Sequence, residues 1–243
     1  PGRGRWVVVK STVTVLTARA EEGHAWEPSF ERSEVRLVRA VRPALVLGST
    51  QQVGLLDEAA AQSAGFEVVR RRSGGGVVEL GPSALWVDVA IPRDDPRWDD
   101  DVGRAAGWVG RAWADALAPH LENGFARSVV VHEGPPVASE AGRLVCFAGV
   151  AAGEVLVGER KVVGISQRRT RAGAWFQCIA YRSWSRRWLP LLSVEPCDMT
   201  PLEQRLTHHA VGLDEILRPA GGGSVCEEVD EVIVDLLAAF DAG

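Results

Sequence analysis

Lys161 is the residue that most clearly suggests chemistry in this sequence. Lysine and arginine together number 27, but only Lys10 and Lys161 are lysines. A chain that meets its general need for positive charge with arginine would have replaced a lysine that is merely solvated. The lysine ammonium is a compact charge on a slim stem, whereas the guanidinium is a planar fork. We therefore predict that Lys161 reaches a carboxylate and a phosphate oxygen together, in a space where arginine does not fit.

A glycine-rich stretch supplies a candidate binding loop. In VVRRRSGGGVV, residues 68–78, arginines end an apolar segment, and a serine with three glycines follows. Glycine permits positive φ and lets a ligand approach bare backbone, and successive N–H groups in such a turn can bind an anion. Guanidinium groups add charge-assisted hydrogen bonds to phosphate or carboxylate. Between two apolar segments, this combination favours an anion site over a flexible surface turn.

Cys146 is the third candidate. It lies in RLVCFAG, residues 143–149, fifteen residues before Lys161. A cysteine beside a buried lysine could have a lowered pKa and, as a nucleophile, form a thioester. The sequence also allows a small buried side chain on a core strand. Both interpretations stay open.

Composition and charge limit the classes of function. The chain has 243 residues, of which 46% are hydrophobic and 24% charged, with a formal net charge of −5. This charge argues against a general nucleic-acid binder and against binding to an anionic membrane, but leaves room for a local basic pocket. The sequence has no secretory signal and no apolar run near 18 residues, so we expect a cytoplasmic protein.

The cysteines and histidines predict no metal site. The four cysteines form no CxxC motif, and we expect them to be reduced thiols. His208 and His209 are adjacent on a predicted helix and point about 100° apart, so they do not form a chelating pair.

The apolar pattern predicts an α+β fold with a mixed, largely antiparallel sheet flanked by helices. The expected strands are residues 6–16, 43–51, 66–72, 84–92, 143–149 and 174–181, with a hairpin over 153–167 that turns at Gly158. The expected helices are residues 29–41, 55–65 and 98–121, then two helices that begin at capping boxes at Thr200 and Ser224, the second after a flexible joint at 221–224. We expect residues 1–243 to form a single catalytic domain, with 200–243 as C-terminal helices and no separate accessory domain.

Residues 160–167 would place alternate side chains on opposite faces of a strand. One set is Lys161, Val163, Ile165 and Gln167, and the other is Val162, Gly164 and Ser166. Because glycine weakens a strand, Gly164 indicates that another group packs closely over it. We predict that Lys161 and residues 73–78 line one pocket that is narrow and apolar at one end, with Trp86 and Trp175 as candidate wall residues.

Three motifs resemble, in the same order, those of the lipoate–protein ligase A family, within the biotin and lipoate protein ligase and octanoyltransferase superfamily. They are VVRRRSGGGVV, LVCFAG and GERKVVGISQRR, and PALVLGSTQ at 43–51 is similar to the strand before the first helix of the family's site. The resemblance spans roughly residues 43–181. It implies a catalytic domain like that of biotin ligases and class II synthetases.

The resemblance also implies roles for residues. Lys161 would bridge the acyl carbonyl and the α-phosphate of an acyl-adenylate, and Arg71 would be the likelier nucleotide contact of the arginine pair. The implied cofactor-binding residues are Arg70, Arg71, Ser73, Gly74, Gly75, Gly76, Val77, Val78, Gly164, Ile165 and Ser166. A ligase would use ATP and Mg²⁺ with lipoate or octanoate. The acceptor would be a lipoyl domain of a 2-oxoacid dehydrogenase complex or the glycine cleavage H protein.

The sequence departs from the family pattern in two places. Glu79-Leu80 stands where many members carry His-Asp, and AWFQC at 174–178 stands where a His-Gly element is often found. Three functions therefore stay open: the ligase, an octanoyl or lipoyl transferase with Cys146 as nucleophile, and a non-catalytic member that binds lipoate or an adenylate. GRGRW at 2–6 also resembles the adenylate loop of biotin ligases, but short glycine–arginine strings are common in an arginine-rich chain, so we interpret it as chance.

Overall fold

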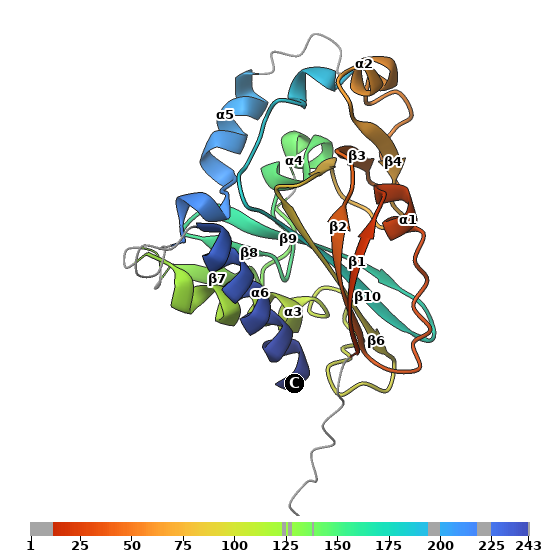
Figure 1. The fold of residues 1–243 in the computed structure, drawn as a ribbon, viewed down its shortest axis with the longest axis vertical. Helices are drawn as coiled ribbons and strands as arrows, with labels where there is room; N and C mark the ends of the chain where they lie inside the picture. The colour runs from red at the N-terminus through yellow and green to blue at the C-terminus, as the bar shows by residue number, and fades with distance from the viewer. Residues whose placement is uncertain are drawn as a thin grey trace, which may run out of the picture.

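Two β-sheets form the framework, and helices pack around them (Figure 1). The computed structural model describes residues 12–122, 125, 128–137, 139–193, 200–217 and 225–242. The larger sheet has seven strands in the order β1-β2-β6-β10-β9-β8-β7. They are β1 (Thr12–Ala18), β2 (Glu34–Ala40), β6 (Ala84–Pro92), β7 (Val129–Val131), β8 (Val155–Val157), β9 (Arg160–Arg169) and β10 (Gly173–Tyr181). Only β1 and β2 pair in parallel within this sheet, so the predicted α+β class with a largely antiparallel sheet is confirmed.

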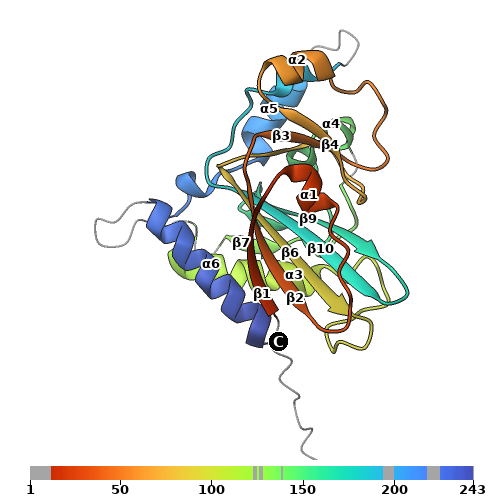
Figure 2. The same ribbon diagram turned by 45° about the vertical axis from the view of Figure 1, so that its right-hand side comes forward.

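The smaller sheet holds the glycine-rich stretch. Its strands are β3 (Ala44–Leu47), β4 (Glu67–Arg70) and β5 (Val78–Leu80), with β3 in the centre. The short helices α1 (Ala20–His24) and α2 (Glu58–Ser63) lie near it (Figure 2). Because the glycines connect β4 to β5, the turn emerges at one end of this sheet. There Ser73 Oγ lies 3.0 Å from Ser166 Oγ on β9, which joins the turn to the larger sheet.

Helices divide the interior into two cores. Helices α3 (Gly107–Leu117) and α6 (Val225–Ala242) pack together over one face of the larger sheet (Figure 2). Trp113 and Phe240 are buried in the core that they form with this sheet. The second core lies between the two sheets and includes Trp86 and Phe147. Helices α4 (Glu140–Leu144) and α5 (Thr200–His209) border it. In the described part of the chain, no helix has the length and apolarity needed to cross a membrane.

The prediction of a helix over 29–41 is wrong, because these residues contain β2. The valines at 35, 38 and 41 mimic helical spacing, but Arg36 is buried and donates to Asp88 Oδ2 on β6 at 2.7 Å. This ion pair lets a charged residue occupy a buried strand position. The neighbouring strands β1 and β6 then pair with β2 on both sides.

Two other elements differ from prediction. The helix predicted over 98–121 begins only at Gly107, because Asp99 and Asp101 accept backbone N–H groups two residues ahead and hold residues 99–103 in turns. The strand predicted over 143–149 is instead the end of α4 followed by a 3-10 turn (Cys146–Ala148). Ser139 caps α4 by accepting from Gly142 N.

Several local predictions are confirmed. The helix predicted over 55–65 is present as α2, and Gly65, just past its end, has φ +85°. Asp57, which was not singled out from the sequence, caps this helix by accepting from Ala60 N. Strands β8 and β9 form the predicted hairpin, with Gly158 at φ +63° in its turn. The two C-terminal helices are present as α5 and α6. Two predictions lie outside the described residues: residues 6–11 of the first strand and the flexible joint at 221–224. The capping side chains of Thr200 and Ser224 also lie outside the described part of the chain.

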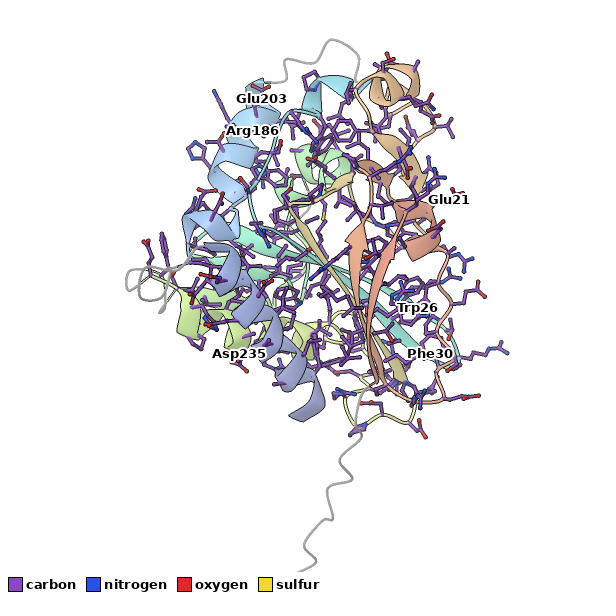
Figure 3. The ribbon with its side chains drawn as sticks, viewed as in Figure 1. Glu21, Trp26, Phe30, Arg186, Glu203 and Asp235 are labelled. Atoms are coloured by element: carbon purple, nitrogen blue, oxygen red, sulfur yellow. The ribbon has the colours of Figure 1, made fainter. Side chains whose placement is uncertain are left out.

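His120 links the end of α3 to α6. It closes a 3-10 turn (Ala118–His120), and its Nδ1 lies 2.7 Å from Glu228 Oε1. Its Nε2 lies 2.9 Å from Oδ2 of Asp235, which Figure 3 labels on α6, and Glu231 Oε2 is 3.9 Å from Nδ1. Burial alone would lower the pKa of His120, but the hydrogen bonds to Asp235 and Glu228 outweigh it and raise the pKa above its usual value.

We expect His120→Gln to lower the free energy of unfolding by about 1 kcal/mol at pH 5.5, because the partly exposed ion pairs are lost. A histidine whose pKa is raised by folding stabilises fully below its unfolded pKa of about 6.5, and this contribution disappears as the pH rises through the folded pKa. The loss should therefore be smaller at pH 9. Urea unfolding at both pH values measures it, with exposed His208→Gln on α5 as control. Equal losses at both pH values would contradict the prediction.

Candidate active site

A cavity of about 650 Å³ lies between the glycine turn, the segment around α4 and the start of β9. Lys161, Cys146 and residues 74–76 all line it, so the predicted sharing of one pocket by Lys161 and the glycine turn is confirmed. A second cavity of about 40 Å³ shares Arg71, Cys146 and two β9 residues with the first. The site is thus wide at one end and narrow at the other.

The Lys161 side chain is buried, with 1% of its surface exposed, and its ammonium is surrounded by acceptors. Nζ lies 2.7 Å from Glu154 Oε2 and donates to the carbonyl oxygens of Cys146 at 2.9 Å and Gly149 at 3.1 Å. Burial alone would lower the pKa of Lys161, but Cys146 and Glu154 outweigh it and raise the pKa above its usual value. The ammonium is therefore charged, and its three hydrogens all have acceptors.

A β-bulge changes the face on which Lys161 lies. Val155 of β8 pairs with Val163, whereas its neighbour Leu156 pairs with Lys161, so β9 has one extra residue here. The alternation predicted for Lys161, Val163 and Ile165 is therefore wrong. A Cβ atom on Gly164 would lie 3.3 Å from Lys161 Cε, which shows that the lysine stem itself packs over Gly164.

Arg71 is buried and holds the glycine turn in shape. Its guanidinium donates to the carbonyl oxygens of Val46, Gly74 and Gly76, with Nη2 at 2.7 Å from Gly74 O and 2.9 Å from Gly76 O. It also lines both cavities. Arg70 faces elsewhere, because its Nη1 donates to the carbonyls of Gly48 and Gln51 and it does not line the larger cavity.

The glycines allow close backbone packing rather than only flexibility. Gly75 has φ +101°, and a Cβ atom on Gly48 would lie 2.0 Å from Gly75 O. A Cβ atom on Gly76 would lie 2.6 Å from Cys146 N. Two backbone hydrogen bonds join this part of the turn to the Cys146 segment, from Val77 N to Leu144 O at 2.8 Å and from Cys146 N to Val77 O at 3.1 Å.

Gly76→Ala should therefore lower the free energy of unfolding by about 1–3 kcal/mol, because the added methyl group overlaps backbone atoms that cannot rotate away. Gly74→Ala is the matched control, since a Cβ atom there meets no atom within 4 Å and we expect a change below about 0.5 kcal/mol. Urea denaturation of the two variants makes the comparison. Equal stability of both variants would show that the turn does not depend on this close approach.

The other predicted binding residues take different positions. Ser73 is buried and donates to Gln177 Oε1 at 3.2 Å, while Ser166 and Ile165 line both cavities. Val78 lines the small cavity, and Val77 is a buried core residue. Gly164 also lines the small cavity.

Cys146 lies at the junction of the two cavities. Its side chain is half-buried, and Sγ lies 3.6 Å from Lys161 Nζ. Val145, not Cys146, occupies the fully buried position beside it. Cys146 is therefore not the core-strand residue that one interpretation of the sequence expected.

Of the two tryptophans predicted as walls, only Trp86 lies at the site. Trp86 lines the small cavity, whereas Trp175 packs edge-on against Trp26 at 5.4 Å and borders a separate surface hollow with Phe30. Figure 3 labels Trp26 and Phe30 on the segment between α1 and β2.

Three buried polar residues that line the two cavities were not predicted from the sequence: Glu154, Gln177 and His24. Glu154 is buried, pairs with Lys161 and accepts from Ile165 N through Oε1 at 3.1 Å. A buried lysine requires a compensating charge, so a carboxylate partner could have been expected, although not its position. Gln177 and His24 line the small cavity and come from β10 and α1, which no local motif connects.

The fold resembles solved lipoate-protein ligases. Over 96% of this chain, a T. acidophilum protein with bound lipoic acid aligns with a TM-score of 0.66, 14% identity and 85% coverage of its own chain. A lipoate-protein ligase A bound with ATP gives the same four values. P. falciparum LipL1 in complex with lipoate aligns at TM-score 0.60 and 11% identity, over 95% of this chain and 63% of its own.

The assignment to a family rests on the sequence and not on the fold alone. The family described as the lipoyl protein ligase A/B catalytic domain matches residues 18–191, more than half of the chain. This chain therefore belongs to that family, and the resemblance seen in its motifs is confirmed. A sequence search of curated proteins gave no match.

Proposed function

We propose that this protein is a lipoate–protein ligase that activates lipoate or octanoate with ATP and transfers the acyl group to a lysine of a lipoyl domain. The observation that carries the proposal is the buried, charged Lys161, which shares one cavity of about 650 Å³ with the glycine turn. A cavity of this size accommodates a nucleotide together with an acyl chain. The proposal assigns both steps to the single catalytic domain over residues 1–243.

In the first step, an oxygen of the acyl carboxylate attacks the α-phosphorus of ATP, and pyrophosphate leaves as the acyl-adenylate forms. Mg²⁺ bound with the nucleotide would neutralise part of the phosphate charge. Lys161 stabilises the charge that develops between the acyl and phosphate oxygens, after exchanging one of its carbonyl acceptors for substrate. Backbone N–H groups of the glycine turn bind the phosphate.

In the second step, the amine of the acceptor lysine attacks the acyl carbonyl, and AMP leaves. The acceptor belongs to a lipoyl domain of a 2-oxoacid dehydrogenase complex or to the glycine cleavage H protein. One structural relative supports this kind of partner: a bi-partite lipoate protein ligase studied with its E2 lipoyl domain from Thermoplasma acidophilum aligns with a TM-score of 0.67 and 14% identity, over 96% of this chain and 83% of its own.

The test mixes the protein with ATP, Mg²⁺ and either lipoate or octanoate, and measures pyrophosphate release and the acyl-adenylate by mass spectrometry. We expect both products with at least one acid. Binding of lipoate without an adenylate, and without acyl transfer from a carrier protein, would favour the non-catalytic alternative.

A transferase is the second candidate, and the position of Cys146 favours it. Cys146 lines both cavities, and its Sγ lies 3.6 Å from Lys161 Nζ, so an acyl group on this sulfur would lie beside the ammonium. In this reaction the thiolate attacks the thioester carbonyl of an octanoyl or lipoyl carrier protein, and the carrier thiolate leaves. The acceptor amine then attacks the Cys146 thioester and releases the cysteine thiolate. Neither ATP nor Mg²⁺ is required.

Cys146→Ala separates the two mechanisms. If the protein is a ligase, adenylate formation by the variant should stay within about threefold of the wild-type rate, because no covalent bond to sulfur is needed. If it is a transferase, the variant should lose transfer from octanoyl carrier protein, and the wild type should gain the mass of an octanoyl group on Cys146. Cys178→Ala is the control for the gain in mass, because this second thiol lines the small cavity but is buried on β10 and should not take the octanoyl group.

A further inference from the structure

The small cavity has room for the end of an acyl chain but not for the whole chain. Its volume is about 40 Å³, where about 10–15 Å³ suffices for one water. Arg71, Cys146, Ile165 and Ser166 line both this cavity and the larger cavity that Lys161 lines, so the two cavities lie side by side. An acyl group whose carboxyl end lies near Lys161 would therefore place its far end here.

One wall of this cavity is polar, although the position suits an apolar tail. His24 and Gln177 line it beside Val78, Leu80 and Ile179. The His24 ring stacks on Trp86 with 4.5 Å between ring centroids, which fixes its orientation. Only 8% of the His24 surface is exposed.

The hydrogen bonds of Gln177 determine which nitrogen of His24 carries the proton. Gln177 Oε1 accepts from Ser73, and its Nε2 lies 3.4 Å from Asp88 Oδ1, so the amide nitrogen faces the carboxylate. The same amide nitrogen lies 3.1 Å from His24 Nδ1. An amide nitrogen only donates, and Nδ1 must therefore accept.

His24 is neutral, because burial, together with the charges of Arg71 and Arg36, lowers its pKa to about 3. A neutral ring that accepts at Nδ1 carries its hydrogen on Nε2. This Nε2 is buried and has no hydrogen-bond partner among the described residues. A buried donor without a partner is unfavourable unless a ligand or water supplies an acceptor.

We propose that His24 is a specificity-determining residue, whose Nε2–H recognises an acceptor atom at the far end of the acyl chain. A dithiolane sulfur supplies such an acceptor, whereas the methyl end of an alkyl chain does not. The site therefore prefers lipoate to an acid of the same shape without sulfur. This inference rests on the proposed function, since it assumes that an acyl chain enters from the Lys161 end.

The test compares three acids: lipoate, octanoate, and 5-cyclopentylpentanoate, which keeps a five-membered ring but has no sulfur. Calorimetry gives the Kd of each acid for the wild type, His24→Phe and His24→Gln. His24→Phe keeps an aromatic ring on Trp86 but has no donor, and His24→Gln keeps a donor. Pyrophosphate release gives an independent readout of activation, and the unfolding midpoint of each variant shows that it is folded.

We expect the wild type to bind lipoate about three- to tenfold more tightly than the cyclopentyl acid, as one neutral hydrogen bond would give. His24→Phe should remove this preference, and His24→Gln should retain part of it. A preference that is the same in the wild type and in His24→Phe, with acids still bound and activated, would overturn the role of His24 alone. If no acid binds or is activated by the wild type, the proposed function itself fails, and this inference with it.

Discussion

Lys161→Arg should lower the rate of adenylate formation by about 10²–10³, although the variant keeps a positive charge. The ammonium is buried among Glu154 Oε2 and two carbonyl oxygens, all within 3.1 Å, and the stem passes over Gly164. A planar guanidinium is wider and cannot present three hydrogens to the same three acceptors and then exchange one of them for substrate. Single-turnover measurement of pyrophosphate release with ATP and lipoate gives the rate.

Arg160→Lys is the matched control for this experiment. Arg160 precedes Lys161 on β9, but its guanidinium pairs with Glu215 near the surface at 2.9 Å. This exchange of the same two residue types should leave the rate within about twofold. If Lys161→Arg retains near wild-type turnover, the charge at position 161 acts without a geometric requirement, and the role that we assign to the lysine is wrong.

Glu154→Ala should lower the free energy of unfolding by about 3–5 kcal/mol, because it leaves the Lys161 charge buried without its counter-ion. Both side chains are at most 3% exposed, so solvent screens the pair little in the folded protein. The variant also removes an acceptor from the backbone N–H groups of Ala151 and Ile165. Urea unfolding followed by tryptophan fluorescence measures the change.

Glu159→Ala provides the reference for the second prediction, because Glu159 is an exposed glutamate in the turn of the same hairpin. We expect Glu159→Ala to lower the free energy of unfolding by less than about 0.5 kcal/mol. The double variant Glu154→Ala/Lys161→Met should recover part of the lost stability, since no unpaired charge then remains buried. A Glu154→Ala protein as stable as Glu159→Ala would mean that the carbonyl groups alone compensate Lys161.

The sequence allowed the site to be located but not completed. Three glycines after adjacent arginines identified the turn at 73–78, and the rarity of lysine identified Lys161. Both signals are informative because few local structures require these residue types. Nearly continuous apolar runs at 84–92 and 174–181 likewise predicted β6 and β10, which are continuous strands in the centre of the sheet. Each of these features depends on residues that are close together in the sequence, so the sequence alone was enough to predict it.

The residues that were missed depend on long-range packing. His24 and Gln177 lie 153 positions apart and meet only because the fold brings the end of α1 beside β10. The bulge in β9 is a single-residue change in pairing with β8 that leaves no distinct sequence pattern, yet it reverses the face of Lys161. Arg36 shows a similar limit, because its ion pair with Asp88 makes a buried strand look like an amphipathic helix.

The hydrogen bonds that Lys161 already makes affect how tightly the site would bind the free acid and the acyl-adenylate. The ammonium already has an acceptor for every hydrogen, through Glu154 Oε2, Cys146 O and Gly149 O. A free acid that replaces one carbonyl oxygen exchanges one hydrogen bond for another and gains little affinity. An acyl-adenylate presents carbonyl and phosphate oxygens together, so it gains more from the same exchange. In the ligase reaction that we propose, this arrangement would favour loose binding of the free acid and firm retention of the reactive intermediate, and would protect that intermediate from release into water before an acceptor lysine arrives.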